Sequence, residues 1–307
     1  MSKAAVANAA CAVAGGVKVF RIERFESVAS TNEGIKRALE QGEPEGLVWR
    51  AVEQTGGYGR QGRAWSSPAG GSYQSLLLRP QVPVTQLPTL GLIAALSVRA
   101  AIARFIDDDI SPVMVKWPND VVCAAGKLSG ISCETHAGGV CVGIGVNVLR
   151  PEKCVPVGGK YSPAYLCDLA GGTGSLEAAC ADRSALDVLA DCEYGGGTET
   201  ADDGRAGFSV FDAGDSRALR DVVEAVGNAV LSEFAIRYEI WQCEGFAAFL
   251  EEYRSCGSLT GRDVRIEAID GSLLSSGRVV GVDEDGRLLL DTASGIVPVS
   301  SGEAHIA

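Results

Sequence analysis

The sequence predicts an α+β fold, in which a mixed β-sheet flanked by helices is followed by a small C-terminal β-barrel. Runs of alternating apolar and polar residues, such as "LVWRAVEQ", interleave with helical segments ahead of residue 110. Residues 112–148 hold β-rich runs separated by Pro-Asn-Asp and by glycines, which is typical of consecutive hairpins. Residues 261–307 contain short alternating runs with Asp-Gly turns, which favour a barrel.

The predicted elements follow in this order. Strands are expected over residues 16–31, 47–54 and 72–80, and helices over residues 30–42 and 87–107. The first helix has a cap at Ser30 or Thr31, Glu33 in its first turn and Gly42 past its end. Three short strands are expected within residues 112–148, and helical periodicity returns over residues 216–256.

The composition is that of an acidic globular protein. The chain has 307 residues, a formal net charge of -12 and a pI near 4.7. Nucleic acid binding needs a basic footprint, so this charge argues against it. The sequence lacks a run of about 18 apolar residues, so we expect no membrane-spanning helix.

The cysteines do not indicate a metal site. The chain has ten cysteines and two histidines, but no two cysteines form the closely spaced C-x-x-C pair that zinc sites use. Several thiols stand in apolar runs such as "GGVCVGIGVNV", where a thiol behaves as a small hydrophobe. We therefore interpret the thiols as reduced and the protein as cytoplasmic.

Two segments are expected to be disordered. Residues 1–16 lack the large apolar residues of a signal peptide and are interpreted as a leader. Residues 191–215 are rich in glycine and contain seven acidic residues and one arginine, a net charge of -6. Such a composition favours a solvated loop.

The stretch "QTGGYGRQGRAW", residues 54–65, places two arginines in a glycine-rich loop. It satisfies G-x-G-x-x-G, but Pro68, Gly70 and Gly71 follow and prevent the helix that a dinucleotide-binding fold requires. Glycines let backbone N–H groups approach an anion, and the arginines Arg60 and Arg63 add charge-assisted donors. The loop is therefore either an anion-binding loop or a solvated surface turn.

A second cluster favours the anion-binding interpretation. "VKWPNDVVCAAGKLSGI" carries Asn119, Asp120 and Lys127, and a hairpin turn explains Asn-Asp but not the tryptophan beside it. Farther along, "GIGVNV" places Asn147 in an apolar strand, where an unpartnered amide costs roughly 1–3 kcal/mol. That amide either bonds to backbone or meets a ligand.

Together these segments resemble the biotin protein ligases, the biotin–[acetyl-CoA-carboxylase] ligase family. The matching pieces are "STN", "QTGGYGRQGRAWSSPAGG", "SLLLRP", "KWPND", "KLSGI", "GIGVN" and "SGEAHIA". The resemblance implies a catalytic domain over residues 17–254, with the mixed sheet of class II aminoacyl-tRNA synthetases and biotin synthetases. Residues 255–307 are then an SH3-like barrel, and residues 152–215 an enlarged insertion whose role the sequence does not reveal.

The resemblance also implies an activity. Members of the family form biotinyl-5′-AMP from biotin and ATP with Mg²⁺, then transfer biotin to a lysine of a biotin carboxyl carrier domain. The implied catalytic residues are Lys127, Arg60 and Arg63, because positive charge must bridge two anions in the first step. The residues implied to hold ATP or the adenylate are Arg60, Arg63, Trp65, Asn119, Asp120 and Asn147. Asp120 is either a candidate for Mg²⁺ at the phosphates or a residue that orients Lys127.

Biotin has an apolar ring system with a ureido head that donates and accepts hydrogen bonds. By the resemblance, the residues that bind it are Ser30, Thr31, Gln54, Gly57, Arg60, Lys127 and Gly130. Small residues would keep the slot narrow enough for the rings.

The chain departs from the family in two ways that bear on function. Tyr58 stands where many members have arginine, and we expect it to substitute by packing or through its hydroxyl. Too few residues precede the first strand for the N-terminal winged helix of bifunctional members, so we expect no DNA binding. The oligomeric state, monomer or homodimer, stays open, and two alternatives remain: a lipoate ligase or octanoyltransferase, and a protein that binds biotin without transferring it.

Overall fold

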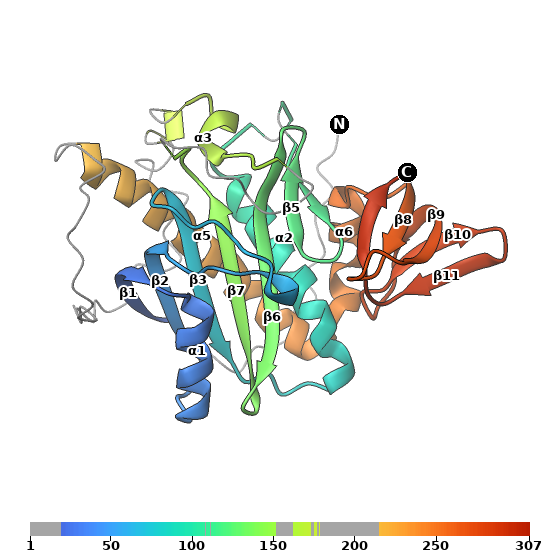
Figure 1. Ribbon diagram of the computed structural model, residues 1–307, viewed down its shortest axis with the longest axis horizontal. Helices are drawn as coiled ribbons and strands as arrows, with labels where there is room; N and C mark the ends of the chain where they lie inside the picture. Colours follow the sequence, from blue (N-terminus) through green and yellow to red (C-terminus); the bar gives the residue numbers. More distant parts are fainter. Residues whose placement is uncertain are drawn as a thin grey trace, which may run out of the picture.

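The computed structural model describes residues 20–107, 109, 110, 112–151, 162–172, 175, 176, 178 and 215–307. The predicted leader, residues 1–16, and all but the last residue of the predicted disordered loop, residues 191–215, lie outside this part of the chain. The described residues form a seven-stranded mixed sheet with helices and a five-stranded antiparallel sheet (Figure 1). The expected α+β fold is confirmed.

The large sheet has the strand order β1-β2-β3-β7-β6-β5-β4. Its strands are β1 (Arg21–Val28), β2 (Leu47–Gln54), β3 (Gly71–Leu78), β4 (Met114–Lys116), β5 (Asp120–Cys123), β6 (Gly126–His136) and β7 (Gly139–Asn147). Only β1 and β2 pair in parallel, because α1 (Thr31–Glu40) carries the chain back between them; the other pairs are antiparallel.

Helices cover both faces of this sheet. Successive side chains of a strand point to opposite faces, and all eight residues of β3 are buried. Leu77 packs with Ile35 and Leu39 of α1, whereas Leu76 and Leu78 belong to the core on the other face. Figure 1 shows α1 in front of the strands, with α2 (Leu90–Ile102) and α5 (Asp215–Glu244) behind them.

The two long helices behind the sheet are core helices. α2 is buried nearly all round, as its Ala- and Leu-rich sequence requires, and follows the 3-10 turn η2 (Val84–Thr89). The segment Val84–Ile102 is long and apolar enough to cross a membrane, but 67% of it is buried inside the protein, as in a core helix. One buried stripe of α5 recurs every three or four residues, at Val222, Val226, Val230, Phe234, Tyr238 and Trp241.

The hairpin region contains four strands, β4 to β7, so the expected three strands were one too few. The run "VVCAAGKLSGI" is broken by a turn at residues 124 and 125 that separates β5 from β6. Gly126 makes the turn possible, with φ of +145° and a position where a Cβ atom would lie 2.1 Å from the carbonyl oxygen of Ser162. The pattern of apolar residues runs straight through this turn, which is why it was missed.

The C-terminal strands form an open sheet and not the closed barrel expected. Their order is β11-β10-β9-β8-β12, and no ladder joins β11 (Gly295–Val299) to β12 (Glu303–Ile306). The inner strands are β8 (Asp263–Glu267), β9 (Leu273–Val282) and β10 (Leu288–Thr292). The predicted Asp-Gly turns are present, with positive φ at Gly271 and Gly286.

The remaining short helices connect these parts. They are α3 (Leu166–Leu169), η5 (Phe246–Phe249) and α6 (Leu250–Cys256). Residues of α6 and of the C-terminal sheet, including Tyr253, Val264 and Val279, belong to the same buried cluster as α2. The two sheets therefore share one continuous core.

Trp117 joins the hairpin region to the C-terminal sheet. It is 2% exposed, and its indole Nε1 donates a hydrogen bond of 2.9 Å to the carbonyl oxygen of Gly286. Gly286 lies against Thr89 and Leu92, so the Asp-Gly turn packs closely on the start of α2. This contact explains why a tryptophan stands beside Asn119 and Asp120, which a hairpin turn alone does not explain.

We predict that Trp117→Phe lowers the stability of the protein, because it removes the hydrogen bond to Gly286 but keeps an aromatic ring. The expected loss is about 1 kcal/mol, measured by chemical denaturation. Trp49→Phe is the matched control, since the buried indole nitrogen of Trp49 has no hydrogen-bond partner among the described residues. Equal losses in the two variants would show that the Trp117 hydrogen bond contributes nothing.

Candidate functional site

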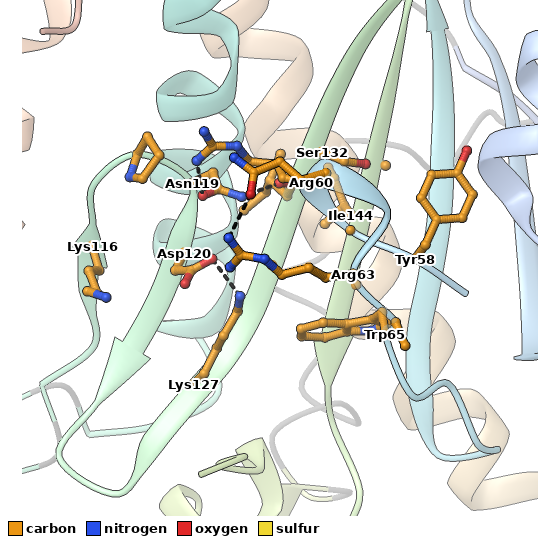
Figure 2. Close-up of a pocket in the computed structure, with 18 of the residues that line it drawn as sticks. Tyr58, Arg60, Arg63, Trp65, Lys116, Asn119, Asp120, Lys127, Ser132 and Ile144 are labelled. Carbon is orange, nitrogen blue, oxygen red and sulfur yellow. Dashed lines mark hydrogen bonds and ion pairs between the residues drawn. The ribbon is translucent and has the colours of Figure 1, made fainter. Parts of the chain in front are cut away.

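A cavity of about 140 Å³ lies on the face of the large sheet that α1 partly covers (Figure 2). Ten of the twelve residues singled out in the sequence line it. They are Thr31, Gln54, Arg60, Arg63, Trp65, Asn119, Asp120, Lys127, Gly130 and Asn147. Segments far apart in the chain therefore meet at one site: the start of α1, the glycine–arginine loop and the hairpin β5–β6.

The other two residues, Ser30 and Gly57, do not line the cavity. Ser30 is buried at the cap of α1, where its carbonyl oxygen accepts a 3.3 Å hydrogen bond from the amide of Gly34. Gly57 accepts a 2.8 Å hydrogen bond from the amide of Trp65, and a Cβ atom there would lie 2.5 Å from Ser67 Oγ. Both residues thus shape the backbone beside the cavity.

One end of the cavity is cationic. Lys127 Nζ lies 2.6 Å from Asp120 Oδ1, and Arg60 donates a 3.1 Å hydrogen bond to Asn119 Oδ1. Asn119 in turn donates to the carbonyl oxygen of Ile131. The β5–β6 hairpin therefore fixes the side chain of Asn119, which positions Arg60. Burial lowers the pKa of Arg60, although the charge of Asp120 opposes this effect. A partly desolvated cation of this kind favours an anionic ligand.

Lys116 is a further cation at this end; it belongs to the stretch "VKWPNDVVCAAGKLSGI" noted in the sequence, but the sequence analysis gave it no role. It is 8% exposed, lines the cavity, and has a pKa lowered to about 8 by burial, although Asp120 opposes the shift. Its place next to "WPND" in the chain was the available signal. In Figure 2 it lies on the opposite side of Asp120 from Lys127.

The C-terminal sheet supplies one wall. Glu303, Ala304 and His305 of β12 line the cavity, and Glu303 forms an ion pair with Arg63. The short helical turn η1 (Arg60–Gly62) begins at Arg60 and ends next to Arg63. Because Arg60 contacts Asn119 and Arg63 contacts Glu303, this turn lies between the β5–β6 hairpin and β12. The motif "SGEAHIA" was noted in the sequence, but nothing in it indicated that it reaches the cavity.

Glycines of β6 and β7 form a floor for Trp65. A Cβ atom at Gly145 would lie 2.7 Å from Trp65 Nε1, and one at Gly130 would lie 3.1 Å from the same ring. Lys127 Nζ stands 5.2 Å from the centroid of the ring. Only residues without a side chain leave room for an indole flat against these strands.

The other end of the cavity is polar and uncharged. Gln54 Oε1 accepts hydrogen bonds from the amide (2.8 Å) and hydroxyl (3.1 Å) of Thr31, while Gln54 Nε2 donates to Ser67 Oγ at 2.9 Å. The Thr31 hydroxyl lies 2.7 Å from Ser75 Oγ. These bonds fix the amide and hydroxyl groups that face the cavity.

Asn32 and Ser132 extend this polar end and were missed in the sequence. Ser75 Oγ donates to Asn32 Oδ1 at 2.6 Å, and Asn32 Nδ2 donates to Ser132 Oγ at 3.0 Å. Both residues line the cavity and are 4% exposed. Asn32 belongs to the noted "STN", but its role depends on β6, a hundred residues later in the chain.

Asn147 resolves the question that its sequence raised. Its side-chain nitrogen donates a 3.1 Å hydrogen bond to the carbonyl oxygen of Lys127, so it bonds to backbone. It also lines the cavity. One side chain therefore supports the strand that carries Lys127 and borders the ligand space.

The cysteines and acidic residues of the described chain form no metal centre. Among these residues there is no group of three or more Cys, His, Asp or Glu side chains that could hold a metal ion. The six described cysteines, at 123, 133, 141, 167, 243 and 256, are free thiols. Burial raises the pKa of the Cys133 thiol to about 12, so this partly buried thiol stays protonated and unreactive at neutral pH.

Comparison with known proteins identifies the family. The model of the biotin/lipoate A/B protein ligase family matches residues 25–149, and that of the biotin protein ligase C-terminal domain matches residues 260–305. The chain belongs to the biotin protein ligase family. The two matches coincide with the segments that surround the cavity.

Individual relatives are similar over most of the chain or over somewhat less than half of it. The bifunctional ligase/repressor BirA of Bacillus subtilis is 28% identical over 287 residues, covering 91% of this chain and 72% of its own. The biotin–[acetyl-CoA-carboxylase] ligase of Mycobacterium tuberculosis is 34% identical over 143 residues, covering 44% of this chain and 53% of its own. The structure of the Aquifex aeolicus biotin protein ligase in complex with biotin and ATP has a TM-score of 0.63 and 25% identity, covering 94% of this chain and 98% of its own.

We predict that Lys116 makes stability depend on pH. Its pKa is about 8 in the folded protein, against 10.5 for a solvated lysine side chain, so the unfolded chain binds more protons between these values and stability rises with pH there. Relative to Lys116→Met, the free energy of unfolding of the native protein should increase by up to about 2 kcal/mol from pH 7.5 to 9.5. Parallel curves from urea denaturation of the two proteins would contradict this.

Proposed function

We propose that this chain is an ATP-dependent biotin protein ligase, which forms biotinyl-5′-AMP and transfers biotin to a lysine of a biotin carboxyl carrier domain. The observation that supports this best is the division of one cavity into a polar, uncharged end and a cationic end. Lys127, Gly130 and Trp65 lie where the two ends meet. A molecule with a neutral polar head and a terminal carboxylate fits this division.

The polar end suits the ureido head of biotin. Each amide nitrogen has two N–H donors, and Gln54 uses one of them on Ser67, which leaves one for a ligand carbonyl. Ser132 Oγ accepts from Asn32, so its own hydrogen is available to a ligand as well. Gly143 faces Ser132 across the β6–β7 ladder and keeps this part of the cavity open, because a Cβ atom there would lie 2.2 Å from Asn32 Oδ1.

The cationic end suits the first chemical step. The biotin carboxylate attacks the α-phosphorus of ATP, the bond to the bridging oxygen breaks, and pyrophosphate leaves with that electron pair. Two anions must approach each other, so cations aimed at the developing charge lower the barrier. Lys127 is the cation at the junction of the two ends, and Arg60 and Arg63 lie on the loop that covers the phosphate region.

In the second step the acceptor lysine attacks the acyl carbon of the adenylate as a neutral amine, loses a proton, and AMP leaves. The mixed anhydride also reacts with water, so retention under a closed loop protects it. Trp65 offers a face for adenine, since aromatic side chains stack on bases. Asn119, Asp120 and Asn147 border the same region.

Magnesium would enter with the nucleotide. The described residues offer no three-ligand site of their own, and Mg²⁺ is commonly held by one or two carboxylates together with substrate phosphates. Asp120, at the cationic end, is the residue that would contribute. The ion would neutralise phosphate charge there.

Further parts of the proposal concern organisation and partners. We place the catalytic domain at residues 17–254 and the SH3-like domain at 255–307, and we place the protein in the cytoplasm without DNA or membrane as a partner. The acidic net charge of -12 supports the absence of DNA binding.

The test is to mix the protein with Mg-ATP and either biotin or lipoate, and to measure pyrophosphate release. Release with biotin alone is expected. Release with lipoate alone would point to a lipoate ligase, and none with either to a binding protein. Addition of a carrier domain, followed by mass spectrometry, should show one biotinylated lysine.

We predict that Lys127→Met lowers the rate of pyrophosphate release at least about a hundredfold, since a lost charge-stabilising group costs 10²–10³ in rate. Arg254→Gln is the control, because Arg254 is an exposed residue of α6 that pairs with Glu251 and lies away from the cavity. A Lys127→Met enzyme that retains more than half its activity would disprove the role assigned to Lys127.

We predict that Gly145→Ala weakens ATP binding about tenfold or more, because the new methyl group would lie 2.7 Å from Trp65 Nε1 and displace the ring. Calorimetric titration with ATP measures the effect. Gly91→Ala is the control, since its methyl group meets other atoms only at 3.8 Å and beyond. Wild-type ATP affinity in the Gly145→Ala protein would contradict a stacking role for Trp65.

A further inference from the structure

Tyr58 attaches the glycine–arginine loop to α1. Its hydroxyl lies 2.5 Å from Glu33 Oε1 and 2.8 Å from Lys36 Nζ, and the Lys36 ammonium stands 5.2 Å from the centroid of its ring. Figure 2 shows the tyrosine pointing away from Arg60, Arg63 and Lys127. It therefore takes no part in the cationic end.

Within the described chain, three side chains of residues 55–65 hydrogen-bond to other elements: Tyr58, Arg60 and Arg63. The two arginines contact Asn119 and Glu303, groups of the cationic end. An anion bound there competes for both arginines, so these contacts are exchanged when the ligand enters. The contact of Tyr58 with α1 is the one that ligand binding can leave in place.

The site on α1 that receives Tyr58 is itself fixed. Lys36 Nζ lies 2.6 Å from Glu134 Oε2 of β6, and Glu134 Oε1 accepts a 3.3 Å hydrogen bond from Asn32, at the polar end of the cavity. Lys36 is 19% exposed in its side chain, so its charge is only partly screened by water. A chain of side-chain contacts thus runs from the loop to the polar end.

The protonation states suit a permanent contact. The hydrogen bond from Tyr58 lowers the pKa of Glu33, which keeps this carboxyl an acceptor. Burial, together with the contact to Glu33, raises the pKa of Tyr58 to about 12, so the phenol remains a donor at neutral pH. An arginine at this position would bring a second cation to Lys36.

We propose that Tyr58 is a positioning residue that holds the glycine–arginine loop over the bound adenylate through Glu33 and Lys36, and so sets how long the adenylate is retained. The proposal rests on the proposed function for its second half, the adenylate. Its first half, anchoring of the loop, does not depend on any ligand. The two halves can be measured separately.

The first measurement is backbone amide exchange of residues 55–65 in the ligand-free protein. Tyr58→Phe keeps the ring and removes the hydroxyl, and Glu33→Gln keeps an acceptor and removes the charge. Both should speed exchange of the loop. Glu40→Gln is the matched control, since Glu40 lies on the same helix and pairs with His136, away from the loop.

The second measurement is the release of adenylate from protein loaded with biotin and Mg-ATP and then freed of excess substrate. Tyr58→Phe should release it about tenfold faster, as expected for the loss of a hydrogen bond to charged groups. The rate of pyrophosphate release at saturating substrates should change much less. A general structural defect would lower both together.

Amide exchange of residues 55–65 at the wild-type rate in both Tyr58→Phe and Glu33→Gln would contradict the proposal that Tyr58 anchors the loop. An equal increase of exchange in Glu40→Gln would contradict it as well. Faster exchange with wild-type retention of adenylate would overturn the positioning role. If the native protein released no pyrophosphate with biotin, the proposed function would fall, and the exchange data would still decide whether Tyr58 anchors the loop.

Discussion

Electrostatic repulsion between a carboxylate and a polyphosphate is the constraint on which the arrangement of this molecule depends. A chain with a net charge of -12 must gather cations at one place to bring such groups together. It does so with Lys116 at the end of β4, Lys127 in β6 and the arginines of the glycine loop. Lys127 and the two arginines each contact an acidic or amide side chain, and the arginines exchange these partners for the anions when the anions arrive.

Those contacts explain why acidic and amide groups stand among the cations. Without a ligand, mutual repulsion within a cluster of partly buried positive charges would destabilise the fold. Asp120 compensates Lys127, and Glu303 compensates Arg63. The C-terminal sheet thus takes part in the site through charge, and the hydrogen bond from Trp117 to Gly286 holds that sheet next to the hairpin that carries Asp120.

The sequence predicted the elements whose pattern is local. The strand at residues 47–54 and the first helix were placed within two residues of their ends, because alternation and capping are properties of neighbouring residues. The hairpin turn at residues 124 and 125 was missed because no polar or proline residue marks it. Closure of the C-terminal strands was expected wrongly, since pairing of the outermost strands depends on contacts between residues distant in the chain.

The same distinction between local sequence patterns and contacts of distant residues applies to the residues of the site. Residues in dense motifs, such as Arg60 and Lys127, were found from the sequence, and the cavity brings them together. Asn32, Ser132 and Lys116 were given no role in the sequence, because each depends on contacts with strands distant in the chain. Ser30 stands at the cap of α1 beside the cavity, where its side chain makes no capping hydrogen bond. Tyr58 shows the reverse case. Its departure from the family pattern was visible in the sequence, but its contacts with Glu33 and Lys36, and that of Lys36 with Glu134, became visible only in the structure. Those contacts give the departure a physical meaning: Tyr58 is an anchor that stays attached to α1 while the arginines exchange their partners for phosphate.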